Sequence, residues 1–335
     1  MIFGEVPIDQ AEGAILAHSE RAAGQLFRKG MRLTAADVAL LAQDHARLVV
    51  ARAEAGDIHE DAAASRLADA LLDFGAAEGL ARSPAFTGRV NLAATGPGLI
   101  ALDVPAIHRL NAVDPAITLA TLPPFARVSA GTLVATVKII AYAVLEAALA
   151  AACAQARAAI RLCPVQRGSA GLILTEGPGQ DRKLLAKGRR AVEARLQALG
   201  MQLAEVRVLP HDSRAIAAAL PDLAGDLALI LTASATSDLQ DTAPAALRLA
   251  GGTVHRFGMP VDPGNLLFHG DLAGRPVIGL PGCVRSPALN GADFVLERYA
   301  CGLAVSDADI AAMGVGGLLK ETPSRPHPRQ AGPQD

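Results

Sequence analysis

Tryptophan is absent from this sequence of 335 residues, and aromatic residues make up only 3% of it. Proteins that bind single-stranded nucleic acid stack the bases on aromatic side chains, so this scarcity argues against such a partner. The formal net charge of −2 also lacks the cationic excess that attracts a phosphate backbone. We therefore expect no nucleic-acid partner. Any anion site must be local, built from backbone N–H groups, helix N-termini and a few arginines.

Cysteine is scarce as well, and long apolar runs are missing. No CxxC pair or zinc-like cluster occurs, so free thiols in a reducing cytosol fit better than a disulfide framework. The longest apolar stretch, residues 139–152, is interrupted by Glu146 and is shorter than the roughly 20 residues that cross a bilayer. The first residues show no signal-peptide pattern. We expect a cytoplasmic protein with no membrane partner. The cysteines are Cys153, Cys163, Cys283 and Cys301.

The length and the 51% hydrophobic content favour two domains with sizeable cores. The composition changes at residues 161–169, where we place the boundary. Beyond it, predicted strands at 170–174, 203–208, 227–232, 253–257 and 276–280 alternate with predicted helices at 183–199, 213–220, 242–249 and 288–301. Such alternation predicts the α/β class, with helices on both faces of a parallel sheet. We expect a mixed α+β region over 1–160, a three-layer domain over 165–320 and a Pro-rich tail over 321–335.

The first half combines short elements. Thr34 followed by Asp37 predicts the N-terminus of a helix over 35–46, and a second helix is predicted over 62–73. Residues 86–142 read as mostly β-structure, with one strand over 131–143. An alanine-rich helix is predicted over 145–160.

Three polar or glycine-rich loops directly follow predicted strands and precede predicted helices. They span 175–180, 233–241 and 281–287. Ligands of open α/β sheets bind at the carboxyl ends of the strands, where small residues admit the ligand and helix N-termini offer N–H donors. A fourth loop, residues 259–265, follows another strand. The sequence thus predicts a site for a phosphate-bearing anion at this edge.

The order of these segments carries a resemblance. DLALILTA at 226–233 precedes a small-residue loop that ends at Asp241; later come RFGMPVDPGNLL at 256–267, PGCVRSPALNG at 281–291 and MGVGGLL at 313–319. This combination resembles the molybdopterin-binding domain of the MoeA and MogA families. It is most similar to a MoeA-like subgroup that is often fused to a nucleotidyltransferase of the molybdenum cofactor pathway.

The resemblance implies a ligand and a role. The ligand would be molybdopterin, a pterin dithiolene with a phosphate, or its nucleotide adduct, and the activity a molybdotransferase-type transfer of molybdenum or a nucleotide. Phosphate would lie on backbone N–H groups with Arg285 as the countercharge. Asp241 and Asp238 would be catalytic, and Asp241 would hold Mg²⁺. The predicted cofactor-binding residues are Thr175, Glu176, Gly177, Ser234, Ala235, Thr236, Ser237, Pro263, Gly264, Asn265, Pro281, Gly282, Arg285 and Ser286.

Alternatives stay open for the function and for single residues. The TGDEL-like acidic loop of the molybdate-inserting enzymes is replaced here by Thr175–Pro178, which favours a non-catalytic carrier that serves a separate nucleotidyltransferase. A scaffold without ligand is a third possibility. Asp241 can equally be the N-cap of the next helix. Isolated histidines, among them His211 and His269, read as structural or surface residues. A homo-oligomer is the default assembly.

Overall fold

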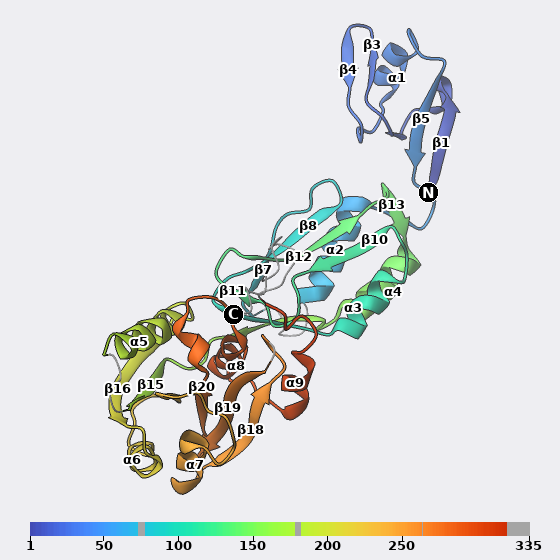
Figure 1. Ribbon diagram of the computed structural model, residues 1–335. Helices are drawn as coiled ribbons and strands as arrows, with labels where there is room; N and C mark the ends of the chain where they lie inside the picture. The colour runs from blue at the N-terminus through green and yellow to red at the C-terminus, as the bar shows by residue number, and fades with distance from the viewer. Residues whose placement is uncertain (73–77, 178–181, 263, 320–335) are drawn as a thin grey trace, which may run out of the picture. The chain divides into compact units, whose positions relative to one another are not determined.

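The chain folds into helices and strands, which Figure 1 labels in chain order. The computed structural model describes residues 1–72, 78–177, 182–262 and 264–319. The chain divides into two units: unit 1 contains Met1–Gly96 and Ile100–Cys163, and unit 2 contains Pro97–Leu99 and Pro164–Asp335. Both units combine helices and sheets, which confirms the predicted α/β class. The predicted tail at 321–335 lies outside the described residues.

Short strands dominate the first half. Its helices are α1 (Ala35–Leu41), α2 (Glu60–Leu72), α3 (Val104–Asn111) and α4 (Glu146–Ala156), with a 3-10 turn at Ile8–Gln10. Its strands are β1 (Ile2–Pro7), β2 (Ile15–Leu16), β3 (Glu20–Ala22), β4 (Gln25–Phe27), β5 (Arg47–Arg52), β6 (Asp57–His59), β7 (Leu80–Arg82), β8 (Arg89–Ala94), β9 (Gly98–Leu102), β10 (Ile117–Thr121), β11 (Arg127–Val128), β12 (Leu133–Ile139), β13 (Ala143–Leu145) and β14 (Ile160–Pro164).

Unit 1 contains two hydrophobic clusters. One gathers apolar residues of α2, α3 and α4 with those of β8, β10 and β12, and Leu67, Leu92 and Leu110 are fully buried in it. The other lies within residues 11–50 and includes Phe27. The predicted capping box is confirmed, because Thr34 accepts a hydrogen bond from the Asp37 amide and Asp37 accepts one from Thr34.

Several predicted elements of unit 1 were wrong in type or length. The stretch 86–142 contains the predicted β-structure, but it also contains helix α3, which was not predicted and begins where the Asp103 side chain accepts a hydrogen bond from the Ala106 amide. The strand predicted at 131–143 is split into β12 and β13. The helix predicted over 145–160 ends at Ala156, because Ala158 adopts a left-handed backbone (φ 56°) and β14 follows. Likewise, α1 ends at Leu41, before the predicted end at 46.

Unit 2 is built on one sheet with strand order β16-β15-β17-β20-β19-β18. Strands β16, β15, β17 and β20 are parallel to one another, as predicted. Strand β19 is antiparallel to both of its neighbours, β20 and β18. The strands are β15 (Ser169–Glu176), β16 (Gln202–Pro210), β17 (Leu227–Leu231), β18 (Thr253–Met259), β19 (Asn265–Leu272) and β20 (Arg275–Leu280). The helices are α5 (Arg182–Gln197), α6 (Ser213–Ala219), α7 (Thr242–Leu249), α8 (Gly291–Ala300) and α9 (Asp307–Ala312), with the 3-10 turn η2 (Gly282–Arg285).

Both faces of this sheet are covered. Every residue of β17 is buried, as a strand between two helical layers requires. Leu229 and Leu231 belong to the cluster that includes α5 and α8, whereas Ala228 and Ile230 belong to the cluster of α6 and α7. Unit 2 is therefore a three-layer domain (Figure 1).

Strand β19 and helix α9 of unit 2 were not predicted from the sequence. Strand β19 forms a hairpin with β18, so the predicted fourth loop is the connection between two paired strands. The predicted helix at 288–301 begins later, at Gly291, behind the N-cap Asn290. No helix among the described residues is long and apolar enough to span a membrane.

Candidate anion site at the carboxyl edge of the unit 2 sheet

The predicted loops converge because their strands are parallel and in register. Glu176 of β15 pairs with Pro210 of β16, and Leu231 of β17 pairs with Leu280 of β20. The segments that follow these residues therefore leave the sheet at one edge. The hairpin connection after Met259 reaches the same edge, because β18 runs in the same direction as β20.

Hydrogen bonds join the three loops. Thr175 is fully buried, and its hydroxyl oxygen accepts a hydrogen bond from the Ala233 amide at 2.8 Å, which ties the first loop to the second. Arg285 in η2 donates from Nη2 to the carbonyl of Thr232 at 2.8 Å, which ties the third loop to the second. Ser234 and Gly282 consequently lie at one rim of the domain.

Arg285 is the cation of this rim. Its Nη1 also donates to the Gly282 carbonyl at 3.4 Å, and its buried Nε has no partner among the described residues. Burial lowers the pKa of its guanidinium from the usual value, but a guanidinium remains charged at neutral pH. No carboxylate of the described chain forms an ion pair with it, so this positive charge is available to a ligand.

The loop after β17 contains backbone N–H groups with no hydrogen bond among the described residues and one that is bonded within the loop. Within the described residues, no hydrogen bond engages the backbone N–H groups of Ser234, Ala235 and Thr236. The Ser237 amide, in contrast, donates to Asp241 at 2.9 Å. The Ser237 N–H was predicted among the phosphate donors, but it is used inside the loop.

Asp241 is the N-cap of α7. One carboxylate oxygen accepts the Thr242 amide at 2.6 Å and the other accepts the Ser237 amide. Burial alone would raise the pKa of Asp241, but these hydrogen bonds and the nearby His211 outweigh it and lower the pKa. Asp238 is a turn residue whose side chain accepts the Gln240 amide at 2.7 Å. Their predicted catalytic roles stay predictions.

A metal at this site also stays a prediction. Across the ranges that the structure describes, no group of three or more His, Cys, Asp or Glu side chains is arranged to hold an ion. Each carboxylate oxygen of Asp241 already accepts one hydrogen bond from a backbone N–H group.

The remaining predicted residues lie at the same edge in different settings. Glu176 is exposed at the end of β15, and Gly177 is half-buried beside it. Asn265 begins β19 and is buried; its Oδ1 accepts the Leu267 amide, and its Nδ2 has no partner in the described structure. Gly264 has a φ of 77°, which suits glycine. Pro263 and residues 178–180 lie outside the described residues. Pro281 is buried, and Gly282 and Ser286 are exposed.

Two residues of the site were missed by the sequence interpretation. Arg195 of α5 donates to the carbonyls of Val284, Ser286 and Ala288 and pairs with Asp293 at 2.6 Å, which holds the third loop in place. His211 directly follows β16, and its ring contacts both Thr175 and Ser234. The signal for His211 was its position after a strand of the parallel sheet, the same rule that identified the three loops.

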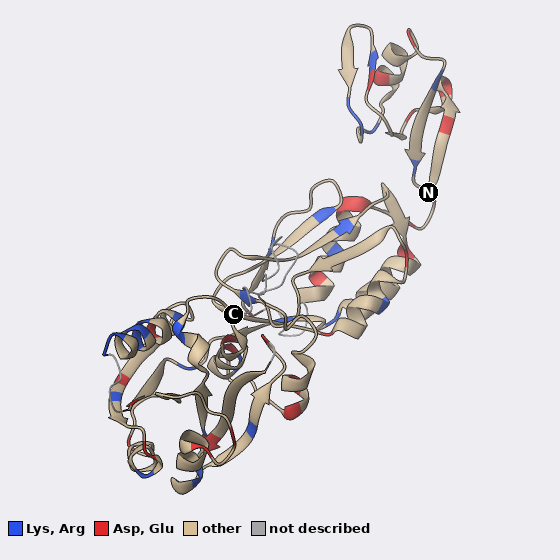
Figure 2. Ribbon diagram, viewed as in Figure 1, with Lys and Arg blue, Asp and Glu red and all other residues tan. Residues whose placement is uncertain are grey.

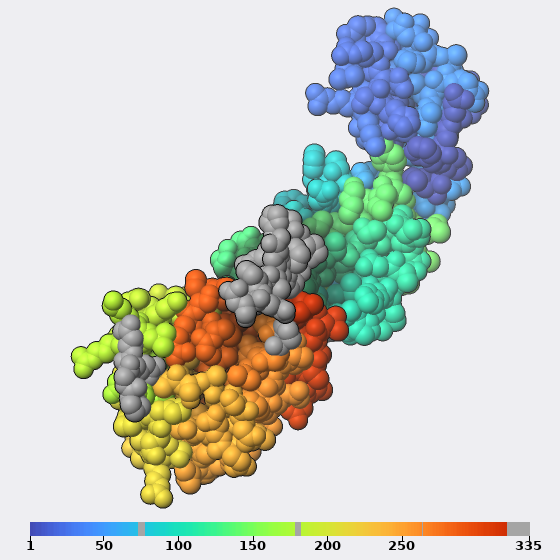
Figure 3. Space-filling view, viewed as in Figure 1, coloured from blue at the N-terminus to red at the C-terminus, as the bar shows by residue number. Residues whose placement is uncertain are grey.

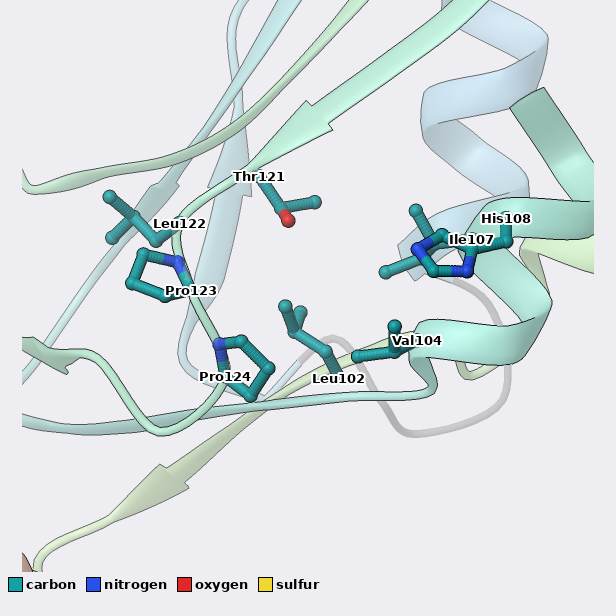
Figure 4. A pocket seen from close by; sticks show the side chains of 8 residues that line it. All are labelled: Leu102, Val104, Ile107, His108, Thr121, Leu122, Pro123 and Pro124. Carbon is teal, nitrogen blue, oxygen red and sulfur yellow. The ribbon is translucent and has the colours of Figure 1, made fainter. Parts of the chain in front are cut away.

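A pocket of about 440 Å³ lies elsewhere, within unit 1. Figure 4 shows Leu122, Pro123 and Pro124 on one side of it and Ile107 and His108 on the other. Its lining is mostly apolar, and it shares no residue with the site of unit 2.

The chain was compared with family models, curated proteins and solved structures. The model of a domain of unknown function (DUF8806) matches residues 5–46, within unit 1. No curated protein matches the sequence. Among solved structures, the molybdopterin biosynthesis MoeA protein from Pyrococcus horikosii is similar with a TM-score of 0.31 and 15% identity, over 90% of this chain and 76% of that chain. What the site binds must therefore be argued from its own residues.

Proposed function

We propose that this chain binds molybdopterin, or its nucleotide adduct, through the phosphate, and that it serves molybdenum cofactor biosynthesis. The observation that carries this proposal is the meeting of three loops at one sheet edge. The Thr175 hydroxyl accepts the Ala233 amide and contacts His211, which in turn contacts Ser234. Arg285 donates to the Thr232 carbonyl at the start of the same loop. Free amides and an unpaired guanidinium are the donors that bind phosphate at helix and strand ends.

The surface beside this edge is cationic. Helix α5 packs against η2, and a Cβ on its Gly188 would lie 3.8 Å from Arg285 Nε. Cations in the first turn of a helix oppose its dipole, so Arg182 and Lys183 at this position favour an anion nearby. Figure 2 shows the Lys and Arg of α5, and Figure 3 shows this yellow-green helix at the surface of unit 2. The exposed cations of α5 are Arg182, Lys183, Lys187, Arg189 and Arg190.

The choice of molybdopterin over other phosphate-bearing ligands rests on the motifs at 256–267, 281–291 and 313–319. These segments meet in unit 2: the Asp262 amide donates to the Gly317 carbonyl at 2.8 Å, and a Cβ on Gly291 would lie 2.5 Å from the Met259 sulfur. The resemblance to MoeA-like proteins thus involves segments that pack together.

We favour a carrier over a transferase. Both oxygens of Asp241 accept backbone N–H groups, which fits the N-cap role that was the alternative to catalysis. A carrier would present the cofactor to a separate nucleotidyltransferase. Transfer that depends on Asp241 and Mg²⁺ is the competing proposal.

The test is to purify the chain from a host that makes the cofactor and to identify bound pterin by mass spectrometry. We expect molybdopterin with the wild-type chain and strongly reduced amounts with Arg285→Ala. Arg21→Ala, an exposed position in unit 1, is the control and should retain the pterin. A chain purified without any pterin contradicts the binding proposal, and molybdate- and Mg²⁺-dependent transfer by the purified chain contradicts the carrier.

A further inference from the structure

Three side chains from separate segments form a hydrogen-bonded row at the anion site. The hydroxyl of Thr175, at the end of β15, lies 3.0 Å from Nδ1 of His211, which follows β16. Nε2 of the same ring lies 3.1 Å from the hydroxyl of Ser234, in the loop after β17. Thr175 is fully buried, His211 half-buried and Ser234 exposed, so the row leads from the core to the rim.

The direction of the hydrogen bonds follows from Thr175. Its oxygen accepts the Ala233 N–H, and a hydroxyl has one proton to donate. If Thr175 also accepted a proton from His211 Nδ1, its own proton would have no acceptor among the described residues. Burying an unsatisfied hydroxyl is unfavourable, so Thr175 donates to Nδ1.

This direction determines the state of the ring and of the serine. Because Nδ1 accepts, the neutral imidazole carries its proton on Nε2. Nε2–H then donates to the Ser234 oxygen, and the serine proton is left to point toward the exposed side. Each group in the row donates outward, and such chains polarise one another so that the last donor is strengthened.

We propose that Thr175, His211 and Ser234 form a one-directional relay that presents the Ser234 hydroxyl as a donor to an unprotonated, anionic oxygen of the ligand. His211 is a positioning residue in this relay. The inference rests on the proposed function for the identity of the anion, since Ser234 lies beside the free amides of the same loop. The relay itself rests on the three contacts.

The opposite direction has a different chemical meaning. If Ser234 donated to Nε2, the pair would resemble an activated serine nucleophile with its general base. Fluorophosphonate reagents label such serines, because the serine oxygen displaces fluoride from phosphorus while the histidine takes the serine proton. The relay predicts no labelling of Ser234.

The first experiment measures the His211 tautomer by two-bond ¹H–¹⁵N correlation spectra of the full chain at pH 8, with His211→Gln to assign the signal. We expect the Nε2–H form, with Nδ1 shifted by the hydrogen bond that it accepts from Thr175. This signal should be unchanged in Arg285→Ala, should move toward that of an unbonded nitrogen in Thr175→Val, and should return in Thr175→Ser. An Nδ1–H ring, or fluorophosphonate labelling at Ser234, overturns the relay.

The second experiment titrates the chain with inorganic phosphate. Ser234→Ala removes a hydrogen bond to a charged group, so we expect it to weaken phosphate binding by about tenfold or more. His211→Ala and Thr175→Val should weaken binding by about three- to tenfold. His211→Gln, whose amide can accept from Thr175 and donate to Ser234, should recover most of it.

The two proposals fail in different ways. Phosphate binding that is lost in Arg285→Ala but unchanged in Thr175→Val and His211→Ala would overturn the relay and leave the anion site intact. No phosphate binding by the wild-type chain would contradict the anion site, and with it the donor role of Ser234, even if the Nε2–H tautomer is observed.

Discussion

At the scale of single residues, Asp241 joins the candidate site to the stability of unit 2. Its side chain closes the loop after β17 through Ser237 and begins α7 through Thr242. Removing an N-cap costs about 0.5–2 kcal/mol, so Asp241→Ala should lower the free energy of unfolding by that amount. The free energy of unfolding of Asp241→Asn should lie between those of the wild-type chain and Asp241→Ala, because the amide has one acceptor oxygen for two N–H donors.

Urea denaturation measures this loss, and a phosphate titration measures its effect on the site. Thr34→Ala is the matched control, because Thr34 forms the corresponding cap of α1 in unit 1. It should cost a similar free energy and leave phosphate binding unchanged. Equal stability of Asp241→Ala and the wild-type chain would contradict the cap.

His269 makes the stability of unit 2 depend on pH. The ring is fully buried, with Nδ1 2.8 Å from the Tyr299 hydroxyl, and burial, helped by His255, lowers its pKa to about 4. The pKa of this histidine in the unfolded chain is higher, at about 6.5. The contribution of the neutral His269 ring to the free energy of unfolding is therefore complete above pH 6.5 and is lost as the pH falls toward 4. The loss should reach about 3 kcal/mol.

The measurement is the free energy of unfolding between pH 7.5 and 4. His269→Gln should flatten the slope in this window, whereas His18→Gln, an exposed site in unit 1, should leave it unchanged. If the free energy of unfolding of His269→Gln depended on pH as steeply as that of the wild-type chain, groups other than His269 would cause the pH dependence.

His211 and Arg195 show why part of the site was not predictable. The residues that His211 contacts lie 36 and 23 positions away, and no spacing along the chain connects them. Arg195 contacts carbonyl groups of a loop that begins almost 90 residues later. Loop composition after a strand predicts the edge of the sheet, but side chains that bridge loops become visible only once the strand order is known.

At the scale of elements, helix α5 is expected to attract the ligand by its charge. The double variant Lys187→Glu with Arg190→Glu reverses two exposed cations of α5, the helix that packs against η2. Phosphate binding should weaken by about three- to tenfold at low salt, and the difference should shrink at high salt because exposed charges are screened. Titrations at two ionic strengths measure this.

The matched control for α5 is the double variant Arg21→Glu with Arg28→Glu, which changes the charge of the chain by the same amount in unit 1. It should leave phosphate binding unchanged. Equal weakening by both double variants would show that net charge, and not the position of α5, attracts the anion.

The missed elements have local causes. The sequence of β19 contains Gly270, and glycine within a strand reads as a break. In the structure a Cβ on Gly270 would lie 1.9 Å from the Thr253 carbonyl oxygen, so the close pairing of β18 and β19 requires glycine. Helix α3 was missed because it is short and lies between strands. Strands β15, β17 and β20 were predicted well, because burial on both faces leaves them almost continuously apolar.

Gly279 in β20 tests this packing. A Cβ there would lie 1.8 Å from Cε1 of Phe268, which is fully buried in the neighbouring strand. Gly279→Ala should therefore destabilise the chain by about 1–3 kcal/mol through overpacking. Gly4→Ala in β1 is the control, since a Cβ there meets nothing within 4 Å. Denaturant unfolding of both variants gives the comparison, and equal stability would contradict the packing.

At the scale of the whole molecule, the hydrophobic clusters are confined to the units. Leu110 is buried with α2 and β8 in unit 1, whereas Phe268 and Ile230 are buried among helices α6 and α7 in unit 2. Because each unit has its own core, we expect separate unfolding transitions in calorimetry. Leu110→Ala should lower one transition, since such truncations cost about 2–5 kcal/mol. Gly279→Ala should lower the other.

A ligand of unit 2 identifies its transition independently. Phosphate at about 100 times its dissociation constant should stabilise the unit that binds it by about 2.7 kcal/mol. We expect phosphate to raise only the transition that Gly279→Ala lowers, and to have no effect on either transition in Arg285→Ala. A single transition that both core variants lower would mean that the two units unfold together. If phosphate instead raised the transition that Leu110→Ala lowers, the anion would bind to unit 1 and not to unit 2.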